Sequence, residues 1–569
     1  MTRSNNLFRQ YQLITRPSRR QISSSSSDRT STSPQRRGPA VDRRLAEPRR
    51  FSDIPGPMAL PMMRHSAHIL PRIGSFHHVV GLGLLDSLRT RYGDLVRLAK
   101  GSRTRPVLYV FDPEMMRESC HPMNLPTLSL IHLVASPTMN LPRCLQVYDS
   151  SATAPPHWEG SPLSQQRKTN PNRCPIQGDE SKAIWAALRA LLLDGSLLKN
   201  YEKAFDDIAT DATRRLEELR HAENALNEEI ETELYRWALE SLGVLVFGTR
   251  LGCLDGPAHV PTDENRTPEQ TSLDDDAPAQ CSLTKRSLSG LTAAERLVRA
   301  SRDVASGGCL VRSELTLRPD TDTFNEALKA FDTHFSLMEH FLKQGLEGID
   351  SGELAPEKSL LDKLRPLKNR LLPVTADMML AGVDPLAQSA LGMLYHLSLH
   401  AAQQQRAHDE VSWAAASRSA GAGCPELPYL AGVAREALRL HPATGGVVRR
   451  SREEFVVADY VVPAGVDIVL AHGVTSKCDK EWGRPKAFIP ERWCSDWQPL
   501  SASRAHPLAS MPFGESCPAE GVVGKMLASL ATRILDKYRL EWHGPPPNLV
   551  TAGVNKIQQP FYFVLKNAA

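Results

Sequence analysis

The sequence lacks long apolar runs and paired cysteines. No stretch approaches the length of apolar chain, about 20 residues, that a membrane-spanning helix needs, and the apolar segment at 58–63 is followed by Arg64 and His65. The ten cysteines are scattered without a C-x-x-C pair, so neither a disulfide framework nor a cysteine-rich zinc site is expected. The N-terminus has no apolar core, so no secretory signal is expected. These features favour a reducing compartment, in which a single thiolate can take part in chemistry.

Acidic residues are scarce at the N-terminus. Residues 1–50 contain 12 Arg, no Lys and three acids, for a net charge of +9, and include five consecutive serines at 23–27. This composition is typical of a mitochondrial transit peptide, and the alternative is a disordered basic tail. The whole chain carries only +4, which leaves −5 for the rest and does not indicate nucleic-acid binding.

Residues 51–569 are expected to form one large domain that is mainly α with a minor β-sheet region. The hydrophobic fraction of the chain, 41%, is sufficient for a large core. Apolar residues recur at helical spacing most clearly at 375–399, and 200–245 is predicted to be a nearly unbroken helix. Alternating patterns predict strands at 106–112 and 454–470.

Two segments, at about 120–180 and 255–320, are predicted to be irregular or inserted. The first is rich in Pro, Ser, Thr and Asn, and the second is polar with an acidic run at 274–276. Both exceed the length that loops usually have in compact domains.

Three motifs after residue 375 carry candidate chemistry. Glu436 and Arg439 are three residues apart on one predicted helix face and can pair, although such pairs usually lie on the surface. Arg492, between Glu491 and Trp493, is placed for a fixed ion pair. Cys517 lies in a loop just before the last predicted helix, whose N-terminus favours a thiolate. Each motif is weak alone.

Together and in this order, the motifs resemble the cytochrome P450 family, and specifically its mitochondrial animal branch. The resemblance covers roughly residues 53–119, 180–254 and 322–566. It implies the P450 fold, with Glu436, Arg439 and Arg492 as a lock of the core beside the haem. The residues that match the family's haem-binding positions are Trp185, Arg189, Arg449 and Phe513, with Cys517 as the iron ligand.

The resemblance implies a monooxygenase that contains haem b with an axial thiolate, which favours O–O cleavage. Asp384 would deliver protons to bound dioxygen. A mitochondrial ferredoxin would supply electrons by contacting Arg435 and Lys525. The substrate would be lipophilic and steroid-like, and the enzyme would lie on the matrix side of the inner membrane, in peripheral contact with it. An arthropod ecdysteroid hydroxylase and a xenobiotic oxidiser are the two identities suggested within the branch.

The sequence departs from the family at two places. Cys517 follows Phe513 by four residues instead of seven, and Val522 stands where the family's later sequence would place the ligand. Pro385 and Leu386 replace the two alcohols that usually follow Asp384. Two alternatives therefore remain open: a haem-thiolate isomerase or dehydratase, and a non-catalytic, haem-deficient relative that acts as a binding scaffold.

Overall fold

The computed structural model describes most of the chain after residue 47. The described residues are 48–57, 81–98, 106–120, 178–220, 225–226, 229–256, 258, 292–313, 322–353, 359–419, 426–451, 453–494, 500–514, 517–552 and 554–568. From Arg50 onward they belong to one compact unit. The predicted transit peptide and nearly all of segment 120–180 lie outside the described residues, so both predictions stay predictions.

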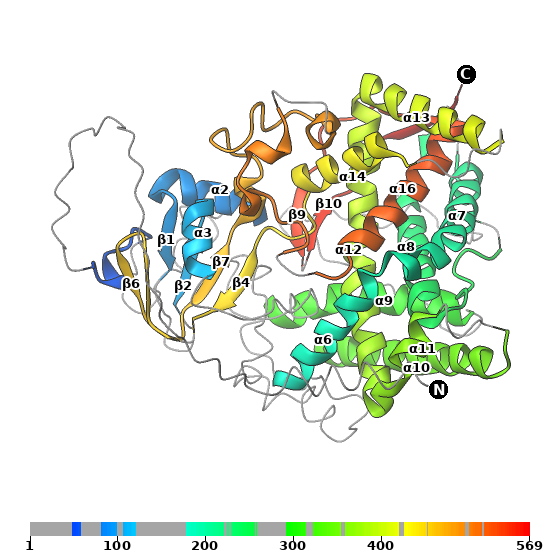
Figure 1. The fold of residues 1–569 in the computed structure, drawn as a ribbon, viewed down its shortest axis with the longest axis horizontal. Helices are drawn as coiled ribbons and strands as arrows, with labels where there is room; N and C mark the ends of the chain where they lie inside the picture. The colour runs from blue at the N-terminus through cyan, green and yellow to red at the C-terminus, as the bar shows by residue number, and fades with distance from the viewer. Residues whose placement is uncertain are drawn as a thin grey trace, which may run out of the picture. The chain divides into compact units, whose positions relative to one another are not determined.

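A long buried helix, α12 (Leu371–Leu399), organises the helical part of the unit (Figure 1). Most of its side chains are buried, as expected for a helix that is apolar on nearly every face. It packs against α8 (Glu229–Phe247), α14 (Pro428–Leu440) and α16 (Glu520–Lys537). Residues of all four helices belong to one large apolar core. This core places the segments that carry the candidate chemistry around one helix.

The other described helices cover this core and the sheets. They are α2 (Gly81–Tyr92), α3 (Pro113–Cys120), α6 (Gly178–Leu192), α7 (Gly195–Glu218), α9 (Ala293–Ser313), α10 (Asp322–Asp350), α11 (Leu360–Leu364), α13 (Ala401–Ser419) and α15 (His472–Thr475). Short 3₁₀ turns lie at Phe51–Asp53, Arg365–Arg370, Pro490–Trp493, Ala502–Arg504 and Pro507–Ala509.

The largest described sheet has four strands in the order β1 (Leu95–Leu98), β2 (Val107–Val110), β7 (Asp467–Leu470) and β4 (Val447–Arg450). β2 and β7 run parallel and the other neighbours antiparallel. Helices α2 and α3 pack beside it (Figure 1). The parallel pair joins the N-terminal part of the domain to the segment that follows α14.

The remaining strands form three small sheets. They are β5 (Phe455–Val457) with β6 (Tyr460–Val462), β9 (Leu549–Ala552) with β10 (Val554–Ile557), and β3 (Ala225–Leu226) with β11 (Phe563–Asn567) and β8 (Tyr538–Trp542). The sequence-based fold class, mainly α with a minor β-sheet region, is confirmed.

Two sequence-based boundaries are wrong. The helix expected at 200–245 is two helices, α7 and α8, because the backbone between them pairs as β3 with β11 instead of continuing the helix. The segment at 255–320, expected to be irregular or inserted, is not irregular throughout: it contains helix α9, whose buried Ala294, Leu297 and Val298 pack on neighbouring helices. In the part of the chain that the structure describes, no helix combines the length and the apolar character needed to cross a membrane.

Candidate functional site

Cys517 lies three residues before the first residue of α16, and its side chain is partly exposed. Burial of the sulfur raises the pKa of the Cys517 thiol to about 11. A hydrogen bond from the backbone of Ala519 and the positive charge of Arg189 act in the opposite direction and favour the thiolate. The free thiol is therefore protonated at neutral pH, and binding of iron would displace its proton.

The loop before α16 carries Phe513, Gly514 and Cys517. Phe513 packs against the core, and Gly514 has φ of +65°, a conformation that glycine adopts without strain. Val522, which stands where the family's later sequence would place the ligand, is fully buried in the first turns of α16. Among the described residues, Cys517 is thus the cysteine that lies at the N-terminal end of α16.

Two arginines match the family's propionate-binding positions. Arg189 lies exposed on α6, and its charge acts on the Cys517 thiol. Arg449 lies on β4 with 7% of its surface exposed, opposite Ile468 of β7. Trp185 lies on α6 one turn before Arg189, and its side chain falls outside the described part of the structure.

Asp384 is buried on α12, with 8% of its surface exposed. Its Oδ1 lies 3.1 Å from Nζ of Lys556 on β10, and the same Nζ donates a hydrogen bond of 3.2 Å to the hydroxyl of Tyr235 on α8. Burial raises the pKa of the Asp384 carboxyl, while Lys556 opposes that shift. The sequence motif located Asp384 but gave no sign of Lys556 or Tyr235, which come from distant segments.

Helix α12 continues through Pro385 to Leu399. The hydroxyl of Ser389, one turn later, donates a hydrogen bond of 2.6 Å to the Pro385 carbonyl. Leu386 is buried in the apolar core. The two positions after Asp384 therefore offer no hydroxyl, and the nearest alcohol along the helix is bonded to the backbone.

The predicted lock residues form one buried network. Glu436 Oε1 lies 2.7 Å from Nη2 of Arg439 and 3.1 Å from Nε of Arg492, and none of the three side chains is more than 1% exposed. The same carboxylate accepts hydrogen bonds from the indole of Trp493 at 3.0 Å and from the backbone of Ile489 at 3.0 Å. The structure thus brings the three motif residues together, and both carboxylate oxygens of Glu436 accept hydrogen bonds.

The two arginines of this network also fix the chain around it. Arg439 donates to the carbonyls of Ser476 at 2.6 Å and Pro485 at 2.7 Å. Arg492 donates to the carbonyls of Gly483 at 2.6 Å and Arg484 at 2.8 Å. The network therefore ties α14 to the segment after β7.

The expected ferredoxin contacts differ in their surroundings. Arg435 is exposed on α14, and Ala431, one turn earlier, is exposed as well. Lys525 of α16 instead makes an ion pair with Glu202 of α7, which partly neutralises its charge. Arg435 is therefore the more available of the two cations.

A buried histidine pair beside the lock was not anticipated. His396 of α12 and His441, which follows α14, share a hydrogen bond of 2.6 Å between Nε2 and Nδ1. Burial lowers the pKa of His441 to about 3 and holds that of His396 well below its usual range, so both imidazoles are neutral at pH 7. Nothing in the sequence spacing indicates this contact.

The donors fit a haem in their chemistry. A sulfur ligand precedes a helix, one arginine charge acts on that sulfur, and a second arginine is buried at the sheet. A thiolate for iron and cations for two carboxylates are what a haem requires of the protein. In the described part of the chain, no group of three or more His, Cys, Asp or Glu side chains could hold a metal ion by itself.

Comparisons with known proteins identify the family. The cytochrome P450 family matches residues 162–564. The chain is 23% identical over 517 residues to probable cytochrome P450 49a1 of Drosophila melanogaster. The matched region covers 87% of this chain and 79% of that protein. It is 24% identical to the probable mitochondrial cytochrome P450 301a1 of the same fly, over 87% of this chain and 83% of that protein. It is 26% identical to the human mitochondrial 25-hydroxyvitamin D-1 alpha hydroxylase, over 67% and 73% respectively. The chain belongs to the cytochrome P450 family and is a haem b monooxygenase similar to the mitochondrial animal branch.

Proposed function

We propose that this monooxygenase acts in the mitochondrial matrix, receives electrons from a ferredoxin and oxidises a lipophilic, steroid-like substrate, with Cys517 as its iron ligand. Mitochondrial names among the relatives and the Arg-rich, acid-poor residues 1–50 support the location. The relative named as a hydroxylase of 25-hydroxyvitamin D supports the class of substrate. The position of Cys517 before α16, within the influence of Arg189, is the observation that carries the proposal.

In this proposal Cys517 would hold the iron as its thiolate, and Arg189 would stabilise the negative charge of the sulfur. Arg189 and Arg449 would hold the two propionates and so orient the group. A haem iron held by a cysteine thiolate supplies the chemistry that cleaves dioxygen. The lock of Glu436, Arg439 and Arg492 keeps the surrounding chain rigid through its bonds to backbone carbonyls.

Asp384 is the proposed proton donor on α12. Burial raises the pKa of its carboxyl, which favours the protonated form needed to donate. Lys556 orients the carboxyl from the other side and is itself held by Tyr235. Because Pro385 carries no hydroxyl, the carboxyl must act directly or through a water molecule.

The replacement of the alcohol by Pro385 favours one second candidate. A haem-thiolate enzyme that rearranges or dehydrates an already oxygenated substrate needs no proton delivery to dioxygen. Turnover of an organic hydroperoxide without any reductant would favour this candidate over the ferredoxin-dependent reaction.

The absorption spectrum of the reduced, carbon-monoxide-bound protein tests the proposal. We expect the wild type to show the thiolate signature, Cys517→Ser to lose it, and Cys494→Ser, a partly exposed cysteine elsewhere in the fold, to retain it. Equal spectra for Cys517→Ser and the wild type would reject the ligand assignment. Turnover supported only by a microsomal flavoprotein reductase would reject the ferredoxin and the matrix location.

A further inference from the structure

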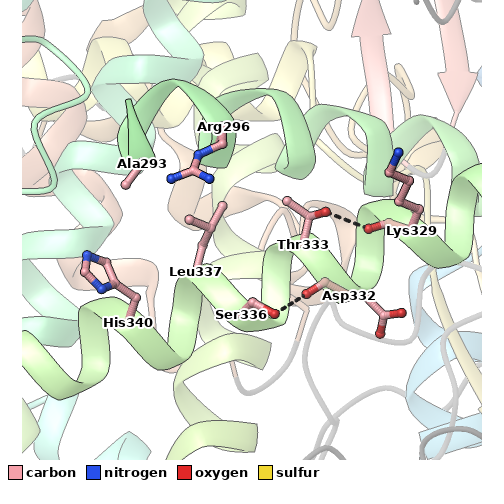
Figure 2. A pocket seen from close by; sticks show the side chains of 8 residues that line it. All are labelled: Ala293, Arg296, Lys329, Asp332, Thr333, Ser336, Leu337 and His340. Atoms are coloured by element: carbon pink, nitrogen blue, oxygen red, sulfur yellow. Dashed lines mark hydrogen bonds between the residues drawn. The ribbon is translucent and has the colours of Figure 1, made fainter. Parts of the chain in front are cut away.

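A groove between α9 and α10 lies outside the proposed haem site and is used by no step of the reaction. Its volume is about 590 Å³, within the usual range for small-molecule sites. The groove is lined by Ala293, Arg296, Lys329, Asp332, Thr333, Ser336, Leu337 and His340 (Figure 2). A cavity of this size, shared by two packed helices, can hold an elongated organic molecule.

Three basic side chains face the groove without a carboxylate to neutralise them. Arg296 extends from α9 toward α10, while Lys329 and His340 stand on α10 (Figure 2). Among the described residues, none makes an ion pair or a hydrogen bond with the side chain of any of the three. In Figure 2 the carboxylate of Asp332, the one acid of the lining, points away from α9. The unpaired positive charge of Arg296 and Lys329 favours an anionic ligand.

The basic residues are spread along the groove. Lys329 and His340 are eleven residues apart on α10, which places them about 16 Å apart along the helix axis. Arg296 and His340 flank the apolar floor made by Leu337 and Ala293, and Lys329 lies toward the other end (Figure 2). A ligand that reaches from one end to the other must be longer than a simple inorganic anion.

Hydroxyl oxygens occupy the middle of the groove. Thr333 Oγ1 donates its proton to the Lys329 carbonyl at 2.8 Å, and Ser336 Oγ donates to the Asp332 carbonyl at 2.8 Å. Both oxygens are left with lone pairs only, so toward a ligand they can accept hydrogen bonds but not donate them. They therefore suit the hydroxyl groups of a ligand, while the cations suit its phosphate.

We propose that the groove between α9 and α10 binds a phosphorylated polyol, with the phosphate at Arg296 and His340 and its hydroxyls along Thr333 and Ser336. Such chemistry occurs in free sugar and glycerol phosphates and in the headgroup of a phospholipid that carries glycerol. This binding is independent of the reaction proposed above, and its failure would leave that proposal untouched.

Calorimetric titration of the full-length, haem-loaded protein tests the site. The probes are glycerol 3-phosphate, inorganic phosphate, and vesicles of phosphatidylcholine with and without an equal part of phosphatidylglycerol. We expect glycerol 3-phosphate, phosphatidylglycerol vesicles or both to bind, and inorganic phosphate to bind more weakly. Arg296→Glu should lower the affinity at least about tenfold, as expected for losing charge-assisted hydrogen bonds.

Lys343→Glu is the matched control. Lys343 lies on α10, the other helix of the groove, is 78% exposed and is not part of the lining, and its substitution changes the net charge equally. It should leave the affinity within about twofold of the wild type, because salt screens exposed charges outside the groove. Binding to vesicles alone identifies a lipid source, and binding to glycerol 3-phosphate alone identifies a free metabolite. The proposal fails if neither probe binds, if both variants lose affinity equally, or if inorganic phosphate binds as tightly as glycerol 3-phosphate.

Discussion

Replacing Arg439 by Ala should remove a large part of the stability of this fold. The guanidinium makes two hydrogen bonds to Glu436, at 2.7 and 2.9 Å, and three to the carbonyls of Ser476, Pro485 and Ala487. Breaking a buried pair by removing one partner costs about 3–5 kcal/mol, because the remaining charge is no longer compensated. Arg492 still pairs with Glu436, so the loss should lie toward the lower end of that range, and it includes the three carbonyls left without their donor. The whole free energy of unfolding of a folded domain is about 5–15 kcal/mol.

The chain contains a close control for this prediction. Glu114 and Arg117 have the same three-residue spacing and the same separation of 2.7 Å, but their side chains are 59% and 65% exposed. Arg117→Ala should therefore cost no more than about 1 kcal/mol, as surface pairs do. Soluble holoprotein yield and the midpoint of thermal unfolding by circular dichroism measure both variants. Similar losses for Arg439→Ala and Arg117→Ala would refute the argument that burial makes this pair important.

Three further outcomes follow from the site. Arg435→Glu should raise the ferredoxin concentration that gives half-maximal turnover more than Lys525→Glu does, since Lys525 is already paired; equal effects would contradict this ranking. Because the pKa of Asp384 is raised above its ordinary value of 3.8, its contribution to stability is greatest below that pH and falls as pH rises through the folded value. Chemical unfolding across pH should therefore show the wild type losing stability relative to Asp384→Asn above pH 3.8, and a constant difference would contradict the shift. Pro385→Thr should increase the product formed per electron pair consumed, and unchanged coupling would show that the missing hydroxyl does not limit the reaction.

The sequence pattern predicted helices and strands correctly where residues close together in the chain determine the local structure. The helix predicted at 375–399 forms most of α12, because its apolar residues recur at helical spacing. Alternation at 454–470 likewise predicted the strands β5, β6 and β7. The strand β3 was missed because its two residues depend on pairing with β11, near the other end of the chain.

The sequence by itself determined the fold class, the family and the identity of most candidate residues, since these follow from periodicity and from ordered motifs. The tertiary structure decided how deeply those residues are buried and which partners they have. The spacing of Glu436 and Arg439 is shared by the exposed pair of Glu114 and Arg117, and only burial, which removes water and its screening, separates a lock from a surface contact. The pairing of Asp384 with Lys556 is likewise set by the packing of β10 against α12, because contacts between distant segments depend on how elements meet and not on local spacing.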